Sequence, residues 1–161
     1  QFGHFESILK TFREDGFVVV SGVLTDGEVS DFLDELWTSP NLLGGKADRH
    51  DQQSWINMWP QQDGGKGFLS SSSPFLDSTP WKLAQHPNVV RLHELLLGSS
   101  VMVTGLGRWG VMRPTQNHPE WRTDSSWLHW DQSPWREPDI FRVQSFACIT
   151  EQSSTSGGFV C

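Results

Sequence analysis

The order of helical and strand-like segments predicts an α+β fold. Helical periodicity occurs only in the first hundred residues, whereas the residues after position 100 carry the apolar and polar alternation that is typical of strands. Strands that follow one another without intervening helices favour an antiparallel sheet over a doubly wound parallel sheet. The 161 residues are enough for a single domain with its own core.

The amino-terminal segment predicts a helix, a strand and a second helix. Apolar side chains recur with a helical period over residues 4–14, and the β-branched run 17–20 follows as a buried strand. Thr25 has the pattern of an N-cap, and Glu28, three residues later, completes a capping box. An apolar stripe makes the second helix amphipathic, and it consists of Val29, Phe32, Leu33, Leu36 and Trp37.

A long polar loop separates these elements from two further helices. Residues 39–74 have no periodicity, contain Gly pairs and a Ser run, and carry Trp55, Trp59 and Phe68. So long a loop in a compact domain is usually functional or partly ordered by its own aromatic side chains. A short helix is expected from Pro80. A longer amphipathic helix is expected from Pro87, which suits a first helical turn, to Gly98, which ends it.

Four strand-like segments fill the rest of the chain, joined by a loop over 114–126 and a turn over 153–158. The second half of the chain is therefore expected to be β-structure. The four segments are 101–112, 127–130, 141–150 and 159–161.

The composition argues against several kinds of partner. With a net charge of −7 and no basic run, nothing is available to neutralise nucleic-acid phosphates or an anionic membrane, so a small-molecule or protein partner fits better. No run of about 18 apolar residues is present, so no transmembrane segment is expected and the chain should be soluble. Cys148 and Cys161 make no disulfide framework and are expected to be buried free thiols, which favours a reducing compartment, the cytoplasm or an organelle interior.

The most informative chemical motif is His129-Trp130-Asp131. Residues two apart in an extended segment share a face, so the side chains of His129 and Asp131 should converge while Trp130 points away. Two His and one carboxylate on one face of an octahedron, with three positions left open, are the ligands expected of non-haem iron. A bare His-x-Asp also arises often by chance, so an ordinary structural role stays open. The third ligand should be a second His, but no His follows His129.

The order of motifs resembles the phytanoyl-CoA dioxygenase family of iron(II)/2-oxoglutarate oxygenases. The resemblance is carried by the run 12–20, by Val23-Leu24-Thr25 before an amphipathic helix, by the His-x-Asp motif and by Gly157-Gly158. It implies N-terminal helices packed on a double-stranded β-helix, or jelly roll. It further implies that His129 and Asp131 bind iron(II) together with a later His, and that 2-oxoglutarate is the cosubstrate.

The resemblance also nominates side chains for the cosubstrate. Arg108, Arg113 and Gln144 lie on predicted strands that flank the motif, where the family places polar groups that contact 2-oxoglutarate. The alternative for each is a solvated or structurally paired side chain.

The chain departs from the family's pattern after Gly157-Gly158. The distal His and Arg of the family are not present, so residues 1–161 resemble the N-terminal portion of one such domain, truncated before these two residues. We expect the 161 residues alone to hold iron and 2-oxoglutarate poorly and to be inactive. An open half of a jelly roll exposes strand edges at 141–150 and 159–161, and we expect protein absent from this sequence to cover them.

Other aromatic and imidazole side chains have structural alternatives. Trp127, Trp130 and Trp135 either wall a pocket or pack between sheets, and packing is the commoner use. His118 is the one other candidate third ligand, but a surface position in its loop is the more ordinary interpretation. The remaining histidines are interpreted as structural or exposed, and they are His4, His50, His86 and His93.

Two functions from different classes follow. In the first, a non-haem iron(II)/2-oxoglutarate-dependent oxygenase decarboxylates 2-oxoglutarate to succinate and hydroxylates a C–H bond of a small organic substrate. In the second, the chain is a non-catalytic jelly-roll relative that serves as a structural or accessory subunit of a larger assembly, and His129 and Asp131 bind no metal. A coding sequence that continues past Cys161 into a His and an Arg would favour the first.

Overall fold

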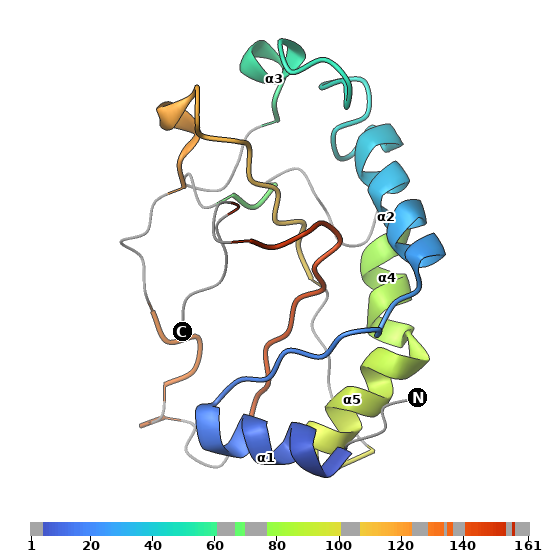
Figure 1. Ribbon diagram of the computed structural model, residues 1–161, viewed down its shortest axis with the longest axis vertical. Coiled ribbons are helices and arrows are strands. Elements are labelled where there is room, and N and C mark those ends of the chain that lie inside the picture. The colour runs from blue at the N-terminus through green and yellow to red at the C-terminus, as the bar shows by residue number, and fades with distance from the viewer. Residues whose placement is uncertain are drawn as a thin grey trace.

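The computed structural model describes residues 5–60, 67–69, 77–100, 107–123, 129–133, 135–136, 141–153 and 156. The helices are α1 (Phe5–Asp15), α2 (Asp26–Thr38), α3 (Ser54–Asn57), α4 (Ser78–Gln85) and α5 (Pro87–Leu97), with a short 3-10 helix, η2 (Pro119–Trp121). In Figure 1, α2, α4 and α5 lie along one side of the molecule and α1 crosses its lower end. The described residues after position 107, which have little regular structure besides η2, lie in the middle and on the other side.

The helices predicted from periodicity and capping are confirmed. The Thr25 hydroxyl accepts from the Glu28 backbone N–H at 3.3 Å, and the Glu28 carboxylate accepts from the Thr25 backbone N–H at 2.8 Å, which is the expected capping box. Pro87 occupies the first turn of α5, and Gly98 ends that helix with a left-handed φ of 66°. In the part of the chain that the structure describes, no helix is long and apolar enough to cross a membrane.

The predicted α+β fold with a jelly roll is wrong for the described residues, because they contain no β-strand. Their β-structure is limited to two isolated bridges, between Asp48 and Asp51 and between Phe68 and Gly110. Residues 141–149 have no regular structure, and 107–115 are irregular except for the bridge at Gly110. Alternating side chains set which face would be apolar, but a strand forms only where a neighbouring backbone supplies its hydrogen bonds.

The same correction applies to the shorter predicted strands. Residues 17–20 form no strand, and Val19 is 86% exposed rather than buried. Of the segment 127–130, the described residues His129 and Trp130 are irregular. The segment 159–161 lies outside the described residues, and so do Cys161 and the Gly157-Gly158 turn. The strand edges for which we expected a covering protein are therefore not found in 141–150.

The core forms where α2 meets the loop that follows it. Leu42 and Leu43, directly after the turn at the end of α2, are fully buried. The loop that was predicted to be polar thus supplies core residues, because its first turns fold back on the helix. The buried cluster consists of Phe32, Leu36, Leu42, Leu43, Leu69 and Trp109, and partly buried Leu24, Trp37, Trp59, Leu83, Val111 and Ile149 pack against it.

The start of α4 is attached to α2 by a carboxylate. Glu35 of α2 accepts from the backbone N–H groups of Ser78 and Thr79 at 2.5 and 2.8 Å, and from both of their hydroxyl groups. These N–H groups lie in the first turn of α4, where no intrahelical acceptor exists and where the helix dipole favours an anion. Beside this contact, the Ser39 hydroxyl donates to the buried carboxylate of Asp77 at 2.8 Å.

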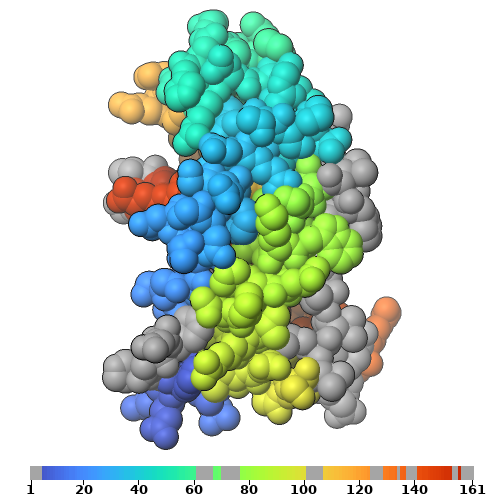
Figure 2. Space-filling view, turned by 90° about the vertical axis from the view of Figure 1, so that its right-hand side faces the viewer, coloured from blue at the N-terminus to red at the C-terminus, as the bar shows by residue number. Residues whose placement is uncertain are grey.

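The far end of α4 is attached to α2 as well. His86 is at once the C-cap of α4 and the N-cap of α5, and its Nδ1 accepts from the Asn88 backbone N–H. Its Nε2 lies 3.0 Å from a carboxylate oxygen of Glu28 in the first turn of α2. Figure 2 shows the result, in which α2 lies alongside the continuous α4 and α5 surface. Two carboxylates on α2 therefore hold the two ends of α4.

Replacing Gly44 with Ala should destabilise the protein by about 3 kcal/mol. A Cβ at this position would lie 2.2 Å from the Thr38 carbonyl oxygen, so the turn that buries Leu42 and Leu43 cannot keep its shape. Gly27→Ala is the matched control, because its Cβ would meet nothing closer than 4.0 Å and Ala favours a helix. Chemical denaturation of both variants measures the difference, and equal stability of the two would contradict the packing of this turn.

Glu35→Gln should lower the free energy of unfolding at neutral pH by about 1–3 kcal/mol, the range for hydrogen bonds to a charged group. Partial burial raises the pKa of Glu35, but the hydrogen bonds from Thr79 and Ser78 together outweigh it, so its pKa lies below 4.5. A carboxyl whose pKa is lowered by folding stabilises the protein above its unfolded pKa and ceases to do so as the pH falls through its folded pKa.

The stability difference between wild type and Glu35→Gln should therefore be complete above about pH 5.5 and shrink as the pH falls below 4.5. Urea unfolding across this pH range measures it. Asp31→Asn, an exposed position on the same helix, is the control and should show little change at any pH. A difference that persists unchanged in acid would show that the Glu35 charge has no part in the contact.

Candidate functional site

His129 and Asp131 converge although they lie on no strand. Nε2 of His129 is 2.8 Å from Oδ1 of Asp131, and the two side chains are 51% and 49% exposed. The chain bends at Asp131, so the two-residue spacing brings the side chains together through a local turn of the backbone. Trp130 between them is 83% exposed. The pair thus places one imidazole nitrogen and one carboxylate oxygen side by side.

Gln144 is the third nominated residue at this place. Its Nε2 donates to Oδ2 of Asp131, so each oxygen of that carboxylate has a partner. Gln144 comes from the segment 141–153, which crosses the middle of the molecule in Figure 1. Three of the five residues nominated from the sequence are therefore brought together. Their roles toward a metal or a cosubstrate remain predictions.

Arg113 is engaged by aromatic side chains. Its guanidinium lies 4.3 Å from the ring centre of Trp121 and 5.1 Å from that of Trp59, and it donates to the Trp55 carbonyl oxygen at 2.9 Å. Burial lowers the pKa of Arg113, and the nearby charge of Glu120 partly opposes this. The guanidinium is thus held in a stack of rings, which is the structurally paired alternative for this residue. Arg108 is exposed, next to the buried Trp109.

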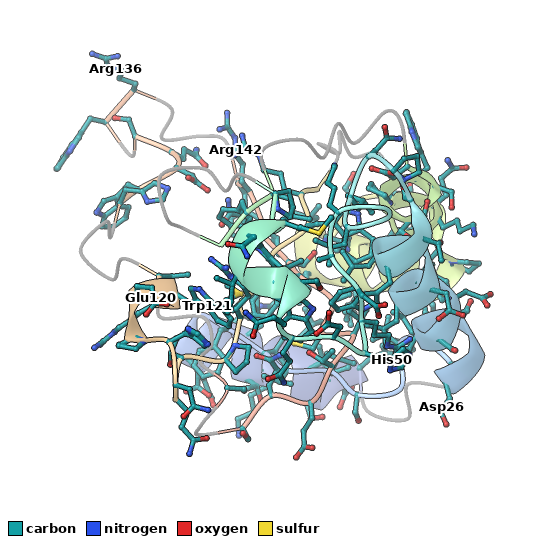
Figure 3. The ribbon with its side chains drawn as sticks, turned by 90° about the horizontal axis from the view of Figure 1, so that it is seen from above. Asp26, His50, Glu120, Trp121, Arg136 and Arg142 are labelled. Atoms are coloured by element: carbon teal, nitrogen blue, oxygen red, sulfur yellow. The ribbon has the colours of Figure 1, made fainter. Side chains whose placement is uncertain are left out.

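His118 belongs to the same stack. Its ring lies 4.0 Å from that of Trp121 at an angle of 13°, and its Nδ1 is 2.9 Å from a carboxylate oxygen of Glu120. The pKa of Glu120 is lowered, first by its own backbone N–H and then by the hydrogen bond with His118. Glu120 and Trp121 lie side by side on η2 in Figure 3. In this position His118 is a partner of Glu120 and does not join His129 and Asp131.

Through Trp59, the Arg113 stack extends to two further Trp rings, those of Trp37 and Trp55. Trp37 of α2 stacks on Trp55 of α3 at 5.6 Å, and both rings contact Trp59, at 6.4 and 5.8 Å. The sequence offered ordering of the loop by its own aromatic side chains as one alternative, but it did not indicate that Trp55 and Trp59 contact Trp37 of α2. Trp55 and Trp59 lie about one helical turn apart in a loop that otherwise has no pattern.

Several predicted environments are wrong. Trp130 and Trp135 are 83% and 90% exposed, so neither packs between sheets, and Trp127 lies outside the described residues. Cys148 was expected to be buried and is an exposed free thiol. These cases have one physical reason: the described residues form no sheet, so no sheet covers the segments that carry these side chains.

The metal donors within the described ranges are incomplete. No group of three or more His, Cys, Asp or Glu side chains gathers there in a way that could hold a metal ion. The imidazole and carboxylate of His129 and Asp131 do suit iron(II) as two of three protein ligands. The geometry therefore fits part of a metal site.

One curated protein gives an independent indication of relationship. The chain is 24% identical over 127 residues to a protein from Dictyostelium discoideum named "Putative phytanoyl-CoA dioxygenase". The match covers 77% of this chain and 36% of that protein, so the chain spans about a third of the relative's length. No family model and no solved structure matches the chain. The similarity suggests a distant relationship to dioxygenases.

Arg113→Lys should lower the stability of the protein by about 1 kcal/mol, since an ammonium is a point charge that cannot stack between two rings as a planar guanidinium does. Thermal unfolding followed by Trp fluorescence measures the loss, and the emission maximum should also shift as Trp59 and Trp121 become hydrated. Arg122→Lys, an exposed position just after η2, is the matched control. An unchanged melting temperature for Arg113→Lys would mean that the stack contributes nothing.

Proposed function

We propose that this chain contributes two metal ligands, His129 and Asp131, to a non-haem iron(II)/2-oxoglutarate-dependent oxygenase that acts on a small organic substrate. The observation that carries the proposal is the approach of His129 Nε2 to Asp131 Oδ1 at 2.8 Å, in a side-chain pair that is half exposed. The distant similarity to a protein named as a phytanoyl-CoA dioxygenase supports the same class of chemistry.

When bound, iron(II) would supply the activation of O₂ by the oxidative decarboxylation of 2-oxoglutarate. The residues of this chain have simpler tasks. His129 donates a neutral imidazole nitrogen, and Asp131 a carboxylate oxygen that balances part of the ion's charge. In this proposal the third ligand is a second His, and none follows His129 in these 161 residues.

Contacts to 2-oxoglutarate belong to the proposal as well. Arg108 is exposed and of the right charge for a carboxylate of the cosubstrate. Arg113 would have to leave the rings of Trp59 and Trp121 to make such a contact, so its present geometry favours the structural alternative. Gln144 is already hydrogen bonded to Asp131.

A second candidate function is a non-catalytic accessory subunit, and one observation favours it. Large apolar side chains in the segments that carry His129, Asp131 and Gln144 are open to solvent, and the exposed fractions are 83% for Trp130, 90% for Trp135, 63% for Phe141 and 64% for Phe146. Exposed aromatic side chains of this size are typical of surfaces that contact other protein. In this function His129 and Asp131 form a hydrogen bond and bind no metal.

His129→Ala should abolish metal binding, because it removes one of the two ligands that this segment provides. Isothermal titration of the full gene product with Fe(II) under anaerobic conditions measures the binding, and succinate release in the presence of 2-oxoglutarate measures turnover. His50→Ala, an exposed histidine outside the pair, is the control. Unchanged Fe(II) affinity and succinate release in His129→Ala would contradict the oxygenase, and absence of both in the wild type would favour the accessory subunit.

A further inference from the structure

Gln144 reaches the candidate metal pair from a different segment of the chain. Its amide Nε2 donates to Oδ2 of Asp131, whereas His129 approaches the other oxygen, Oδ1. A carboxylate with one partner can rotate about its χ2 torsion, which is broad and soft. With a separate partner on each oxygen, the Asp131 carboxylate has a defined orientation. In that orientation Oδ1, the oxygen beside the imidazole, is the one that can join His129 at an ion.

The backbone that carries Gln144 is itself held against α5. Ser145, the next residue, has its hydroxyl 3.1 Å from Nε2 of His93, whose Nδ1 lies 2.8 Å from the Val89 carbonyl oxygen. A carbonyl oxygen can only accept a hydrogen bond, so a neutral His93 donates from Nδ1 to Val89. Its Nε2 then accepts a hydrogen bond from the Ser145 hydroxyl. Further along the same segment, Ile149 packs against the core. The Gln144 amide thus has a supported position and is not the tip of a free segment.

We infer that Gln144 is a positioning residue that orients the Asp131 carboxylate for metal binding. The inference rests on the proposed function, since it concerns the same ion. Groups that hydrogen bond to metal ligands fix their orientation, and loss of one typically weakens metal affinity 10–100-fold. Gln144 in this role acts through Asp131, which differs from the direct contact with 2-oxoglutarate that the family resemblance implies. The side chain needs no cosubstrate for its effect.

A titration with Co(II) alone tests this role without any turnover. Binding is followed in the full gene product through the visible absorption of protein-bound Co(II) and the quenching of Trp fluorescence. Gln144→Met removes the amide donor on a side chain of similar length and should weaken Co(II) binding about tenfold. Gln144→Asn keeps the amide on a shorter side chain and should recover part of the affinity. Gln152→Met, an exposed Gln at the end of the same segment, is the matched control and should bind as wild type does.

The role predicts lower Co(II) affinity for Gln144→Met with an unchanged melting temperature, because a donor to an exposed carboxylate adds little to folding. Wild-type affinity in Gln144→Met, where His129→Ala has lost binding, would overturn the positioning role and leave the proposed metal site intact. Equal weakening in Gln152→Met, or no recovery in Gln144→Asn, would likewise overturn it. If the wild type itself binds no Co(II), the proposed function and this inference fail together.

Discussion

The carboxylate of Glu35 is the contact on which the helical part of this protein depends. It joins α2 to the start of α4 across 43 residues of sequence, and it does so by accepting from backbone N–H groups that would otherwise lack partners. A carboxylate at a helix N-terminus is also stabilised by the helix dipole. Glu35 therefore both accepts from the free N–H groups of α4 and balances the partial positive charge at the start of that helix. The loop between the two helices can therefore be long and irregular without leaving α4 unattached.

The candidate site is built differently, from one local pair and one distant support. His129 and Asp131 meet because they are two residues apart, which needs little from the rest of the fold. Gln144 comes from a segment held by His93 on α5 and by the core, so the helical side of the molecule reaches the pair through that segment. The stack around Arg113 joins α3 to η2, because the guanidinium contacts the Trp121 ring and donates to the Trp55 carbonyl oxygen.

The features that sequence reasoning predicted correctly are those governed by neighbours along the chain. The capping box at Thr25 and the Pro and Gly at the ends of α5 depend on local geometry. His129 and Asp131 do approach each other, but without the strand from which their approach was predicted. The sheet was predicted wrongly, because the alternation of apolar and polar side chains in 141–150 indicates only which side of a strand would be apolar. A strand also needs a neighbouring strand for its backbone hydrogen bonds, and the described residues contain none.

Several of the contacts that escaped prediction join residues that are distant in the sequence. Nothing in the local sequence of Glu35 indicates that it accepts from Ser78, and nothing near Arg113 indicates that its guanidinium lies between Trp59 and Trp121. Such contacts arise from packing and not from any periodic pattern. For the same reason Arg113 was nominated for a cosubstrate, since charge and approximate position were the only guides that the sequence offered.

Two of the carboxylates on α2, those of Glu28 and Glu35, also fix the length of α4. Glu28 and Glu35 are seven residues apart, which is about 10.5 Å along a helix, and the eight residues of α4 span about 12 Å. Glu35 contacts the first turn of α4, and Glu28 contacts His86 at its end. The two helices are therefore antiparallel, and the spacing of the two carboxylates matches the length of α4. Inserting or deleting one residue within α4 would turn one end by about 100° relative to the other, and both contacts could no longer form. Among homologous proteins, α4 should therefore vary in the side chains of its outer face, whereas its number of residues should remain constant.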